Sequence, residues 1–276
     1  MSTQQRFTGR RALVTGASRG IGAAIARRLA AEGADVAITA RTLDTHPTLS
    51  GSLRQTAARL AVHGGRVGVV VADLIDDADR LRIVPEAVVA LGGPIDILVN
   101  NAAAAIYQPV AEISTKRRRL MFEANVHAPL DLAQAVLPGM VAAGRGWIVN
   151  VSSGSARLWD GPPFPTGVTG SAITMYGASK SALNRWTNGL GAELVGSGVR
   201  VNSVEPRAAV MSEGADALVG GRLRPDQIES MEEMVEGALY LCDCPADMTG
   251  QITVSLDLIA THGLVVRDLD GGDWHP

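Results

Sequence analysis

The stretch LVTGASRGIG, residues 13–22, decides the fold of this chain. It begins as an apolar run of strand length, passes through a glycine-rich turn and continues as a helix from about Gly20. Glycines permit unusual backbone angles and a close approach of a ligand to the backbone, and the N-terminus of a helix attracts anions. The stretch therefore predicts a strand–turn–helix unit that binds the pyrophosphate of a dinucleotide. We expect the contacts to come from Gly16, Ser18, Arg19, Gly20, Ile21 and Gly22.

Strands and helices alternate in the predicted structure of nearly the whole chain. Apolar runs predict seven buried strands, at residues 11–15, 34–40, 66–72, 95–100, 146–152, 199–204 and 251–256. Apolar residues three and four positions apart predict helices between them, at residues 21–32, 52–62, 77–91, 114–143, 174–196 and 228–242. Strands that are apolar on both faces and separated by helices indicate a parallel sheet that is covered on each side. We therefore expect an α/β fold of the Rossmann type, with a doubly wound parallel sheet of about seven strands.

The pattern contains neither a linker nor an internal repeat. We expect a single dinucleotide-binding and catalytic domain over residues 1–276, with a core at about 10–256 and a C-terminal extension at 257–276.

Composition excludes several classes of partner. The net charge is −3, so the sequence gives no electrostatic indication of nucleic acid or an anionic membrane. The one basic cluster, residues 116–119, is expected on a solvated helix face. No apolar stretch reaches the roughly 18 residues that span a bilayer, and the polar N-terminus lacks the apolar segment of a secretory signal. Cys242, Cys244 and the five histidines show no metal-site spacing, and we expect a cytoplasmic protein without a bound metal.

The end of the second predicted strand indicates which nicotinamide cofactor is bound. A site selective for NAD(H) places a carboxylate there to accept the ribose 2′-hydroxyl, but this strand ends with Ala40 and Arg41. Arg19 lies in the glycine loop, and arginine binds phosphate in a bidentate manner. We therefore predict NADP(H) rather than NAD(H). The alternative is that Arg41 is an exposed arginine without a ligand.

The stretch MYGASK, residues 175–180, indicates the chemistry. It contains one of only three tyrosines, Tyr176, and Lys180 follows four residues later, on the same face of the predicted helix. A phenol loses its proton near pH 10, and a nearby ammonium together with an oxidised nicotinamide ring would stabilise the phenolate. Lowering the pKa of the phenol to about 7 requires roughly 4 kcal/mol. The compact ammonium could also reach the ribose hydroxyls of the cofactor.

Four motifs occur in a fixed order: TGASRGIG at 15–22, NNA at 100–102, VSS at 151–153 and YGASK at 176–180. Together they resemble the short-chain dehydrogenase/reductase family, of the compact single-domain kind. The resemblance implies a nicotinamide-dependent oxidoreductase that interconverts a secondary alcohol and a carbonyl, and that assembles as a homotetramer or homodimer. It implies a catalytic set of Asn125, Ser153, Tyr176 and Lys180. It also implies cofactor contacts from Asp73 and Leu74 at the adenine, from Asn101 at the nicotinamide side, and from Tyr176 and Lys180.

Two of these assignments have alternatives. Ser153 is assigned from the strand that precedes it, since the loop to Tyr176 is longer than is usual in the family, and Ser155 is the alternative. Asn125 lies four residues before Pro129, which has no N–H, so the helix is expected to kink and to free the carbonyl of Asn125. By resemblance this carbonyl would hold a water molecule of a proton relay to Lys180. Alternatively, the asparagine is merely tolerated at a kink.

The sequence departs from the family pattern at three places. Ala103 stands where the family has glycine. Arg207 follows Pro206, where the family has glycine, and Met211 takes the place of a cofactor-binding threonine, with Ser212 adjacent. The expected Asp-Gly-Gly after the last strand is absent. Arg207 is either a contact for a phosphate or carboxylate, or a solvent-facing arginine.

The substrate is expected to be a small-molecule ketone or alcohol that is bulky and mostly apolar. Residues 153–173 and 206–226 form two long loops after strand ends, where parallel sheets bind ligands. Trp159 and Phe164 in the first loop either wall a substrate pocket or pack within the loop. Two other functions stay open: a dinucleotide-binding regulatory protein without turnover, and a dehydratase or epimerase that retains NAD.

Overall fold

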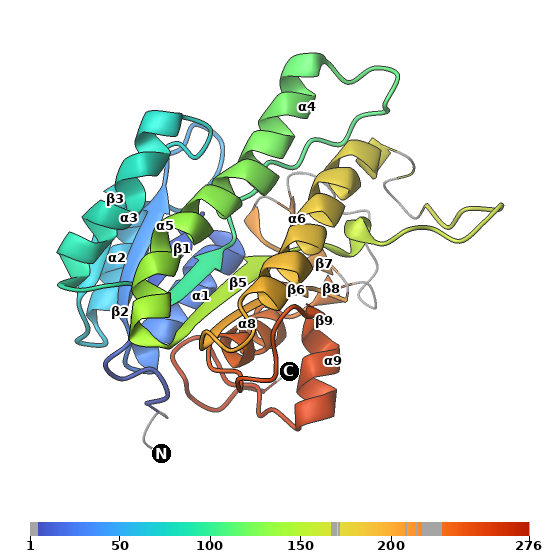
Figure 1. The fold of residues 1–276 in the computed structure, drawn as a ribbon. Helices are drawn as coiled ribbons and strands as arrows, with labels where there is room; N and C mark the ends of the chain where they lie inside the picture. The colour runs from blue at the N-terminus through green and yellow to red at the C-terminus, as the bar shows by residue number, and fades with distance from the viewer. Residues whose placement is uncertain are drawn as a thin grey trace.

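Seven parallel strands form the central sheet of the molecule (Figure 1). The computed structural model describes residues 5–166, 170, 172–207, 209–213, 215–216 and 228–275. The strand order is β3-β2-β1-β4-β5-β6-β9, so the order reverses between β1 and β4. The strands are β1 (Arg11–Thr15), β2 (Asp35–Ala40), β3 (Val67–Val71), β4 (Ile97–Asn100), β5 (Gly146–Val151), β6 (Val199–Glu205) and β9 (Ile252–Val254).

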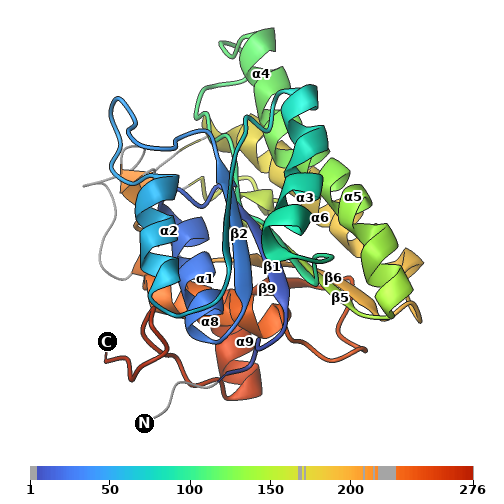
Figure 2. The same cartoon turned by 90° about the vertical axis from the view of Figure 1, so that its left-hand side faces the viewer.

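Helices cover both faces of this sheet, and Figure 2 shows the sheet nearly edge-on between them. One face is covered by α1 (Gly20–Ala31), α2 (Leu53–Ala61), α8 (Met231–Leu241) and α9 (Ser255–His262). The other is covered by α3 (Asp77–Leu91), α5 (Ala128–Ala143) and α6 (Thr174–Glu193). Alternate residues of β1 show the reason, because Ala12 and Val14 join the first hydrophobic cluster and Leu13 joins the second. The predicted doubly wound parallel fold is confirmed.

The long helix predicted at 114–143 is divided into three parts. It consists of α4 (Thr115–Phe122), a π-helical turn η1 (Glu123–His127) and α5. The N–H of Ala128 donates to the carbonyl of Glu123, which is the five-residue spacing of a π-helix. Pro129 has no N–H to continue the α-helical pattern. The α-helical hydrogen-bond pattern is therefore interrupted at the place where the sequence predicted a kink.

Two predicted elements were wrong at their boundaries. The last strand was expected at 251–256, but it ends at Val254 and Ser255 begins α9. Ser255 and Leu256, the last two residues of the predicted strand, belong to α9, which packs into the core through Leu258. The helix expected at 228–242 begins only at Met231, because its first two residues form the short strand β8 (Ile228–Glu229) beside β7 (Ala209–Val210).

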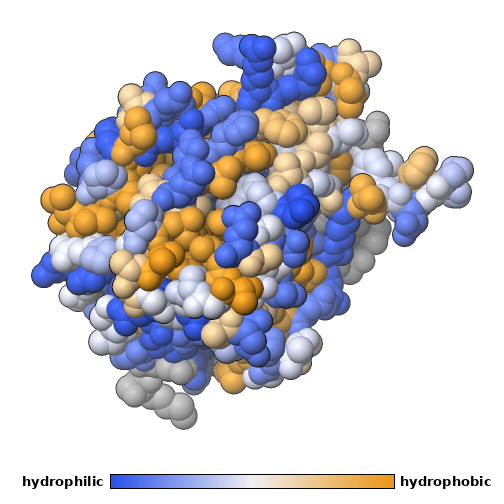
Figure 3. Space-filling view, in the orientation of Figure 1, coloured by the Kyte–Doolittle hydropathy of each residue, from blue (hydrophilic) through white to orange (hydrophobic). Residues whose placement is uncertain are grey.

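The surface agrees with two further expectations. The basic cluster at 116–119 is exposed on α4, and Figure 3 shows strongly hydrophilic residues at this end of the molecule. Phe164 is 55% exposed in the loop that follows the turn η2 (Gly154–Ala156), and Figure 1 shows this loop extending away from the body. This exposure favours the second alternative for Phe164, a residue of the loop rather than a pocket wall. Among the described residues, no helix is long and apolar enough to cross a membrane.

Candidate active site

A cavity of about 410 Å³ lies at the carboxyl ends of β1, β2, β3 and β4. This is the edge at which parallel sheets bind ligands, close to the reversal of strand order. The cavity brings together most of the predicted cofactor residues, namely Gly16, Ser18, Arg19, Gly20, Ile21, Arg41, Asp73, Leu74 and Asn101. Gly22, Tyr176 and Lys180 do not line it.

The glycine loop is held closely against the end of β4. Gly16 has a positive φ of 65°, and a Cβ atom built on it would lie 2.8 Å from the Cα atom of Ala102. The Asn101 amide nitrogen donates to the carbonyls of Thr15 at 3.0 Å and Gly16 at 3.3 Å. A Cβ atom on Gly22 would lie 2.3 Å from that same nitrogen. Gly22 therefore makes room for Asn101, and the Asn101 side chain shapes the loop around the cavity.

The two predicted arginines differ in their surroundings. Arg19 donates from Nε to the carbonyl of Ser50 at 2.7 Å and from Nη2 to the carbonyl of Gly51 at 3.0 Å. Its guanidinium is thus engaged mainly with the chain between β2 and α2. Arg41 is 68% exposed, and its closest ion-pair contact is to Asp73, at 3.8 Å. Arg41 is therefore the more available of the two for a ligand.

Tyr176 and Ser153 meet beside this cavity. Tyr176 lies in the first turn of α6 and is 9% exposed, and Ser153 follows the end of β5. The hydroxyl of Ser153 lies close enough to the phenol of Tyr176 to lower its pKa. Ser153 Oγ also accepts hydrogen bonds from the hydroxyl of Ser155 at 3.0 Å and from its N–H at 3.3 Å. Of the two candidate serines, Ser153 is thus the one that acts on the tyrosine, and Ser155 donates to it.

The turn η2 packs directly on α6 and so positions Ser153. A Cβ atom on Gly177 would lie only 2.4 Å from the carbonyl oxygen of Ser155, so a side chain there would displace the turn. The hydroxyl of Ser181 donates to the carbonyl of Ala156 at 2.7 Å. A glycine and a serine on one helix face therefore hold the serine turn against the tyrosine.

Lys180 is buried one turn after Tyr176. Its side chain is 3% exposed, and Nζ donates to the carbonyl of Val151 at 2.8 Å. Burial lowers the pKa of Lys180 to about 8, because a desolvated ammonium is disfavoured. At neutral pH the lysine is still mostly charged.

The phenol of Tyr176 is made less acidic by its surroundings. Burial raises the pKa of Tyr176, and the nearby Tyr107 raises it further, whereas the hydrogen bond with Ser153 lowers it. The ring centroids of Tyr107 and Tyr176 are 5.7 Å apart. The sequence argument expected a lowered phenol pKa. The protein groups alone do not produce this, because desolvation is the largest cause and Lys180 is directed to a backbone carbonyl.

Asn125 is completely buried, and its side chain joins two segments. Its Oδ1 accepts from the N–H of Ala104 at 2.7 Å, and its Nδ2 donates to the carbonyl of Ala104 at 2.9 Å and to Ser179 Oγ at 2.9 Å. Ser179 in turn donates to the carbonyl of Tyr176 at 2.7 Å. The side chain thus fastens the segment after β4 to α6, a role that the sequence did not reveal.

The departures from the family pattern also have defined positions. Ala103 lines the cofactor cavity. Arg207 forms an ion pair with Asp257, and its N–H donates to Glu229 at 2.8 Å. Ser212 lines the cofactor cavity, whereas Met211 does not. At the position of the family's threonine the chain has Met211, and the hydroxyl that lines the cavity is that of Ser212, one residue later.

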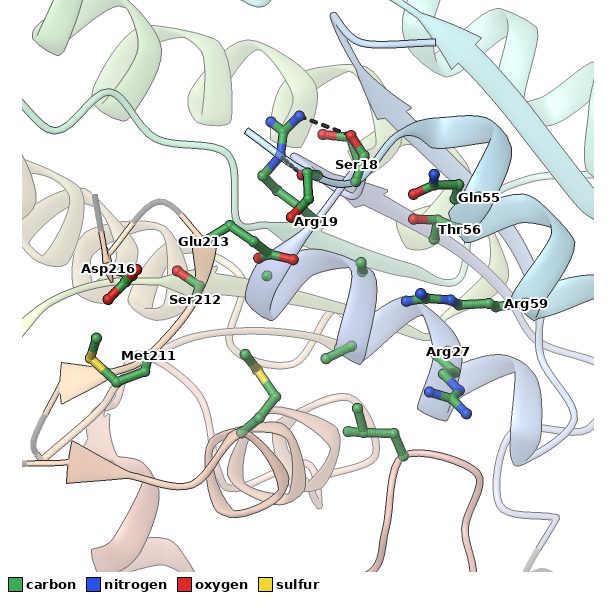
Figure 4. Close-up of a pocket in the computed structure, with 17 residues that line it drawn as sticks. Ser18, Arg19, Arg27, Gln55, Thr56, Arg59, Met211, Ser212, Glu213 and Asp216 are labelled. Atoms are coloured by element: carbon green, nitrogen blue, oxygen red, sulfur yellow. Dashed lines mark hydrogen bonds between the residues drawn. The ribbon is translucent and has the colours of Figure 1, made fainter. Parts of the chain in front are cut away.

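A second cavity, of about 480 Å³, lies beside the glycine loop (Figure 4). The sequence analysis did not anticipate it. Arg27 from α1 and Arg59 from α2 lie on one side of it, and Glu213 and Asp216 lie on the other. Ser212 lines both cavities. No cluster of His, Cys, Asp and Glu suited to a metal occurs within the described part of the chain.

Comparisons with known proteins agree with this arrangement. Residues 10–217 match the family model of the short chain dehydrogenases. Hydroxysteroid dehydrogenase-like protein 2 of Danio rerio is 32% identical over 257 residues. The alignment covers 93% of this chain but only 59% of that protein, so the chain spans about three fifths of the length of this relative.

Solved structures of similar proteins share the fold. A short chain dehydrogenase of Mycobacterium thermoresistibile superposes with a TM-score of 0.81 and 28% identity, covering 96% of this chain and 92% of that one. A 3-oxoacyl (acyl-carrier-protein) reductase of Agrobacterium tumefaciens, with NADP bound, has a TM-score of 0.73 and 29% identity, covering 90% and 93%.

A parallel sheet with a dinucleotide cavity at its carboxyl edge and a Ser–Tyr–Lys group beside it is the arrangement of a nicotinamide-dependent oxidoreductase. The chain belongs to the short-chain dehydrogenase family.

Proposed function

We propose that the protein is an NADP(H)-dependent oxidoreductase that interconverts a secondary alcohol and a ketone or aldehyde. The observation that carries the proposal is that the hydroxyl of Ser153 lies beside the phenol of Tyr176, with Lys180 buried one turn further along the same helix. A bound nicotinamide cofactor supplies or accepts the hydride. The residues of the chain hold the substrate oxygen and move its proton.

Tyr176 acts as the general acid or base, and Ser153 holds the substrate oxygen. Because burial keeps the phenol protonated, Tyr176 is ready to donate its proton to the oxygen of a carbonyl substrate during reduction. Lys180 remains mostly charged at neutral pH and stabilises the phenolate that this transfer leaves. Asn125 supports this site by fastening the segment at Ala104 to α6.

The substrate is proposed to be mostly apolar. Tyr176 belongs to a third hydrophobic cluster, distinct from the two large cores, and therefore has apolar neighbours. The buried and partly buried members around Tyr176 are Ile113, Met121, Ala104, Ala105, Ile106, Tyr107 and Met175. Such walls suit an apolar or aromatic group next to the carbonyl carbon.

The preference for NADP(H) over NAD(H) is supported by the end of β2. Ala40 offers no carboxylate to a ribose hydroxyl, and Arg41 lines the cavity and is largely exposed. The similar reductase with NADP bound agrees with this preference. We also propose a cytoplasmic homotetramer or homodimer, which sedimentation of the purified protein would test.

Replacement of the reacting tyrosine tests the mechanism. In Tyr176→Phe, kcat should fall on the order of 100-fold to 10,000-fold, because the proton donor is removed. The affinity for NADPH, measured by fluorescence titration, should be largely unchanged, since Tyr176 does not line the cofactor cavity. Tyr240→Phe is the matched control, because Tyr240 stacks on His262 and takes no part in the site. Undiminished turnover in Tyr176→Phe would remove the assignment.

Substrate and cofactor are tested together by a panel of carbonyl compounds and alcohols, followed at 340 nm with each nicotinamide cofactor. Faster turnover of apolar ketones with NADPH than with NADH supports the proposal. Much higher activity with NADH would contradict the argument from Arg41. A dinucleotide-binding protein without turnover is the alternative function, and it would bind NADPH but convert no member of the panel.

A further inference from the structure

The chain between β2 and α2, residues 42–52, forms one wall of the cofactor cavity, and several contacts fix it in place. Thr42, His46 and Leu49 line the cavity. Arg19 donates to two backbone carbonyls near the end of this segment, at 2.7 and 3.0 Å. The N–H of Leu53, at the start of α2, donates to the carbonyl of Thr42 at 3.0 Å. The glycine loop and α2 therefore both hold this segment at the cavity.

His46 has a defined tautomer in this segment. Its Nδ1 accepts hydrogen bonds from the backbone N–H groups of Thr48 and Leu49, both at 3.2 Å. A ring nitrogen that accepts from two N–H groups carries no proton, so in the neutral ring the proton is on Nε2. Within the part of the chain that the structure describes, Nε2 of His46 has no hydrogen-bond partner. The ring thus presents a free N–H donor on the side opposite its own backbone.

The charges around this donor suit a phosphate. Arg41 lines the same cavity and has only a loose contact, 3.8 Å, with Asp73. The one acid of the segment, Asp44, is paired with Arg54, which holds the pKa of Asp44 below its usual value. A hydrogen-bond donor and a guanidinium therefore line the same cavity, where the adenosine end of a dinucleotide would bind.

We infer that His46 is a specificity residue, whose Nε2–H donates to the 2′-phosphate of NADP(H) beside Arg41. The inference rests on the proposed preference for NADP(H) and adds to Arg41 a second donor for the 2′-phosphate, the Nε2–H of His46. Arg19, the second arginine predicted for this phosphate, instead fixes the wall that carries His46.

Equilibrium binding of two adenosine nucleotides tests this role without catalysis. The probes are adenosine 2′,5′-bisphosphate, which carries the 2′-phosphate, and adenosine 5′-diphosphate, which lacks it, titrated calorimetrically into the whole protein. In His46→Asn, the amide oxygen can still accept from the N–H groups of the segment, but the Nε2 donor is gone. The preference for the 2′-phosphate should fall about tenfold or more, because a hydrogen bond to a charged phosphate is lost. The affinity for the 5′-diphosphate should not change.

His46→Gln is the matched variant, since its amide nitrogen can reach the position of Nε2 and donate there. It should retain more of the preference than His46→Asn, and equal losses in the two variants would overturn the inference. An unchanged preference in His46→Asn would also overturn it. If the unmodified protein itself binds both probes equally well, the proposed preference for NADP(H) fails, and the role of His46 fails with it.

Discussion

At the scale of the residue, burial acts on the two central groups of the active site in opposite directions. It raises the pKa of Tyr176 and lowers the pKa of Lys180 to about 8. Each shift favours the uncharged form, because charge is costly away from water. The protein without substrate therefore holds a neutral phenol beside a lysine that is still mostly protonated at pH 7. The acidic phenol that the sequence argument required must draw on groups that bind to the protein, as well as on Lys180.

The lowered pKa of Lys180 predicts how stability depends on pH. In the unfolded chain this lysine has a pKa near 10.5, so between pH 8 and 10.5 the unfolded state binds more protons than the folded state. Stability must then rise with pH in this range, by about 3 kcal/mol in total from this one group. The penalty for the buried charge is fully present below pH 8 and disappears as the pH rises toward 10.5.

The measurement compares the wild type with Lys180→Met by urea denaturation at several pH values. The difference between their free energies of unfolding should shift in favour of the wild type from pH 8 to pH 10. The thiols of Cys242 and Cys244, whose pKa is raised by burial, also make stability depend on pH, but they are common to both proteins and cancel. A difference that stays constant over this range would show that the lysine keeps its ordinary pKa when folded.

At the scale of the element, the active site is a junction between α6 and the segments that follow β4 and β5. The helix supplies Tyr176, while Asn125 binds it to one segment and Gly177 allows the other to approach closely. The motif that carries the tyrosine could be recognised in the sequence. The contacts that place its partners could not, because they join residues that are far apart in the chain. A Cβ atom built on Gly177 would lie 2.4 Å from the carbonyl oxygen of Ser155, and this lack of space arises only once the turn and the helix are packed.

A methyl group at this junction should separate Ser153 and Tyr176, the two side chains for which we propose catalytic roles. In Gly177→Ala, the new Cβ atom would displace the turn that carries Ser153, and a misplacement of about 1 Å costs on the order of 100-fold in kcat. The overpacked helix should lose about 1–3 kcal/mol of stability. Gly189→Ala, on the same helix, is the control, because its Cβ atom would meet only the end of the Arg185 side chain, at 3.2 Å. It should leave kcat unchanged and stabilise the helix by up to about 1 kcal/mol.

Steady-state kinetics and thermal unfolding of both variants would decide this prediction. Equal turnover in Gly177→Ala and Gly189→Ala would show that the serine turn can move without consequence. The affinity for NADPH should be the same in both variants, since neither glycine lines the cofactor cavity.

At the scale of the whole molecule, the central sheet could be predicted from the sequence more completely than the last helix and the loop that carries His46. All seven strands were predictable as apolar runs, although the runs are buried on both faces only in the middle of the sheet, and alternate residues of β3 are exposed. The start of α9 at Ser255 was not, since a short apolar run fits a strand and a helix equally well. The glycine loop and Arg41 were predictable from local spacing. The wall that includes His46 was not, because its position depends on Arg19 reaching across to the carbonyls of Ser50 and Gly51.

The C-terminal segment is joined to the body by a buried arginine. Arg28 on α1 is fully buried and pairs with Glu32 and Glu236, and it donates to the carbonyls of Arg267 and Asp268 at 3.0 Å. One side chain thus connects α1, α8 and the chain after α9. An arginine can do this because its planar group donates in several directions at once.

Replacing Arg28 should lower the free energy of unfolding strongly, whereas replacing its neighbour Arg27 should change it little. In Arg28→Met, two buried carboxylates, Glu32 and Glu236, would be left with Arg6 alone, so the free energy of unfolding should fall by roughly 3–5 kcal/mol. Arg27→Met is the matched control, because Arg27 pairs with the half-exposed Asp270 at the surface, and such pairs contribute about 0–1 kcal/mol. Urea denaturation measures both changes, and limited proteolysis should release the end of the chain faster only in Arg28→Met. Similar losses in the two variants would mean that the C-terminal segment is held by its apolar contacts at Leu264 and Leu269 instead, since both pack against the core.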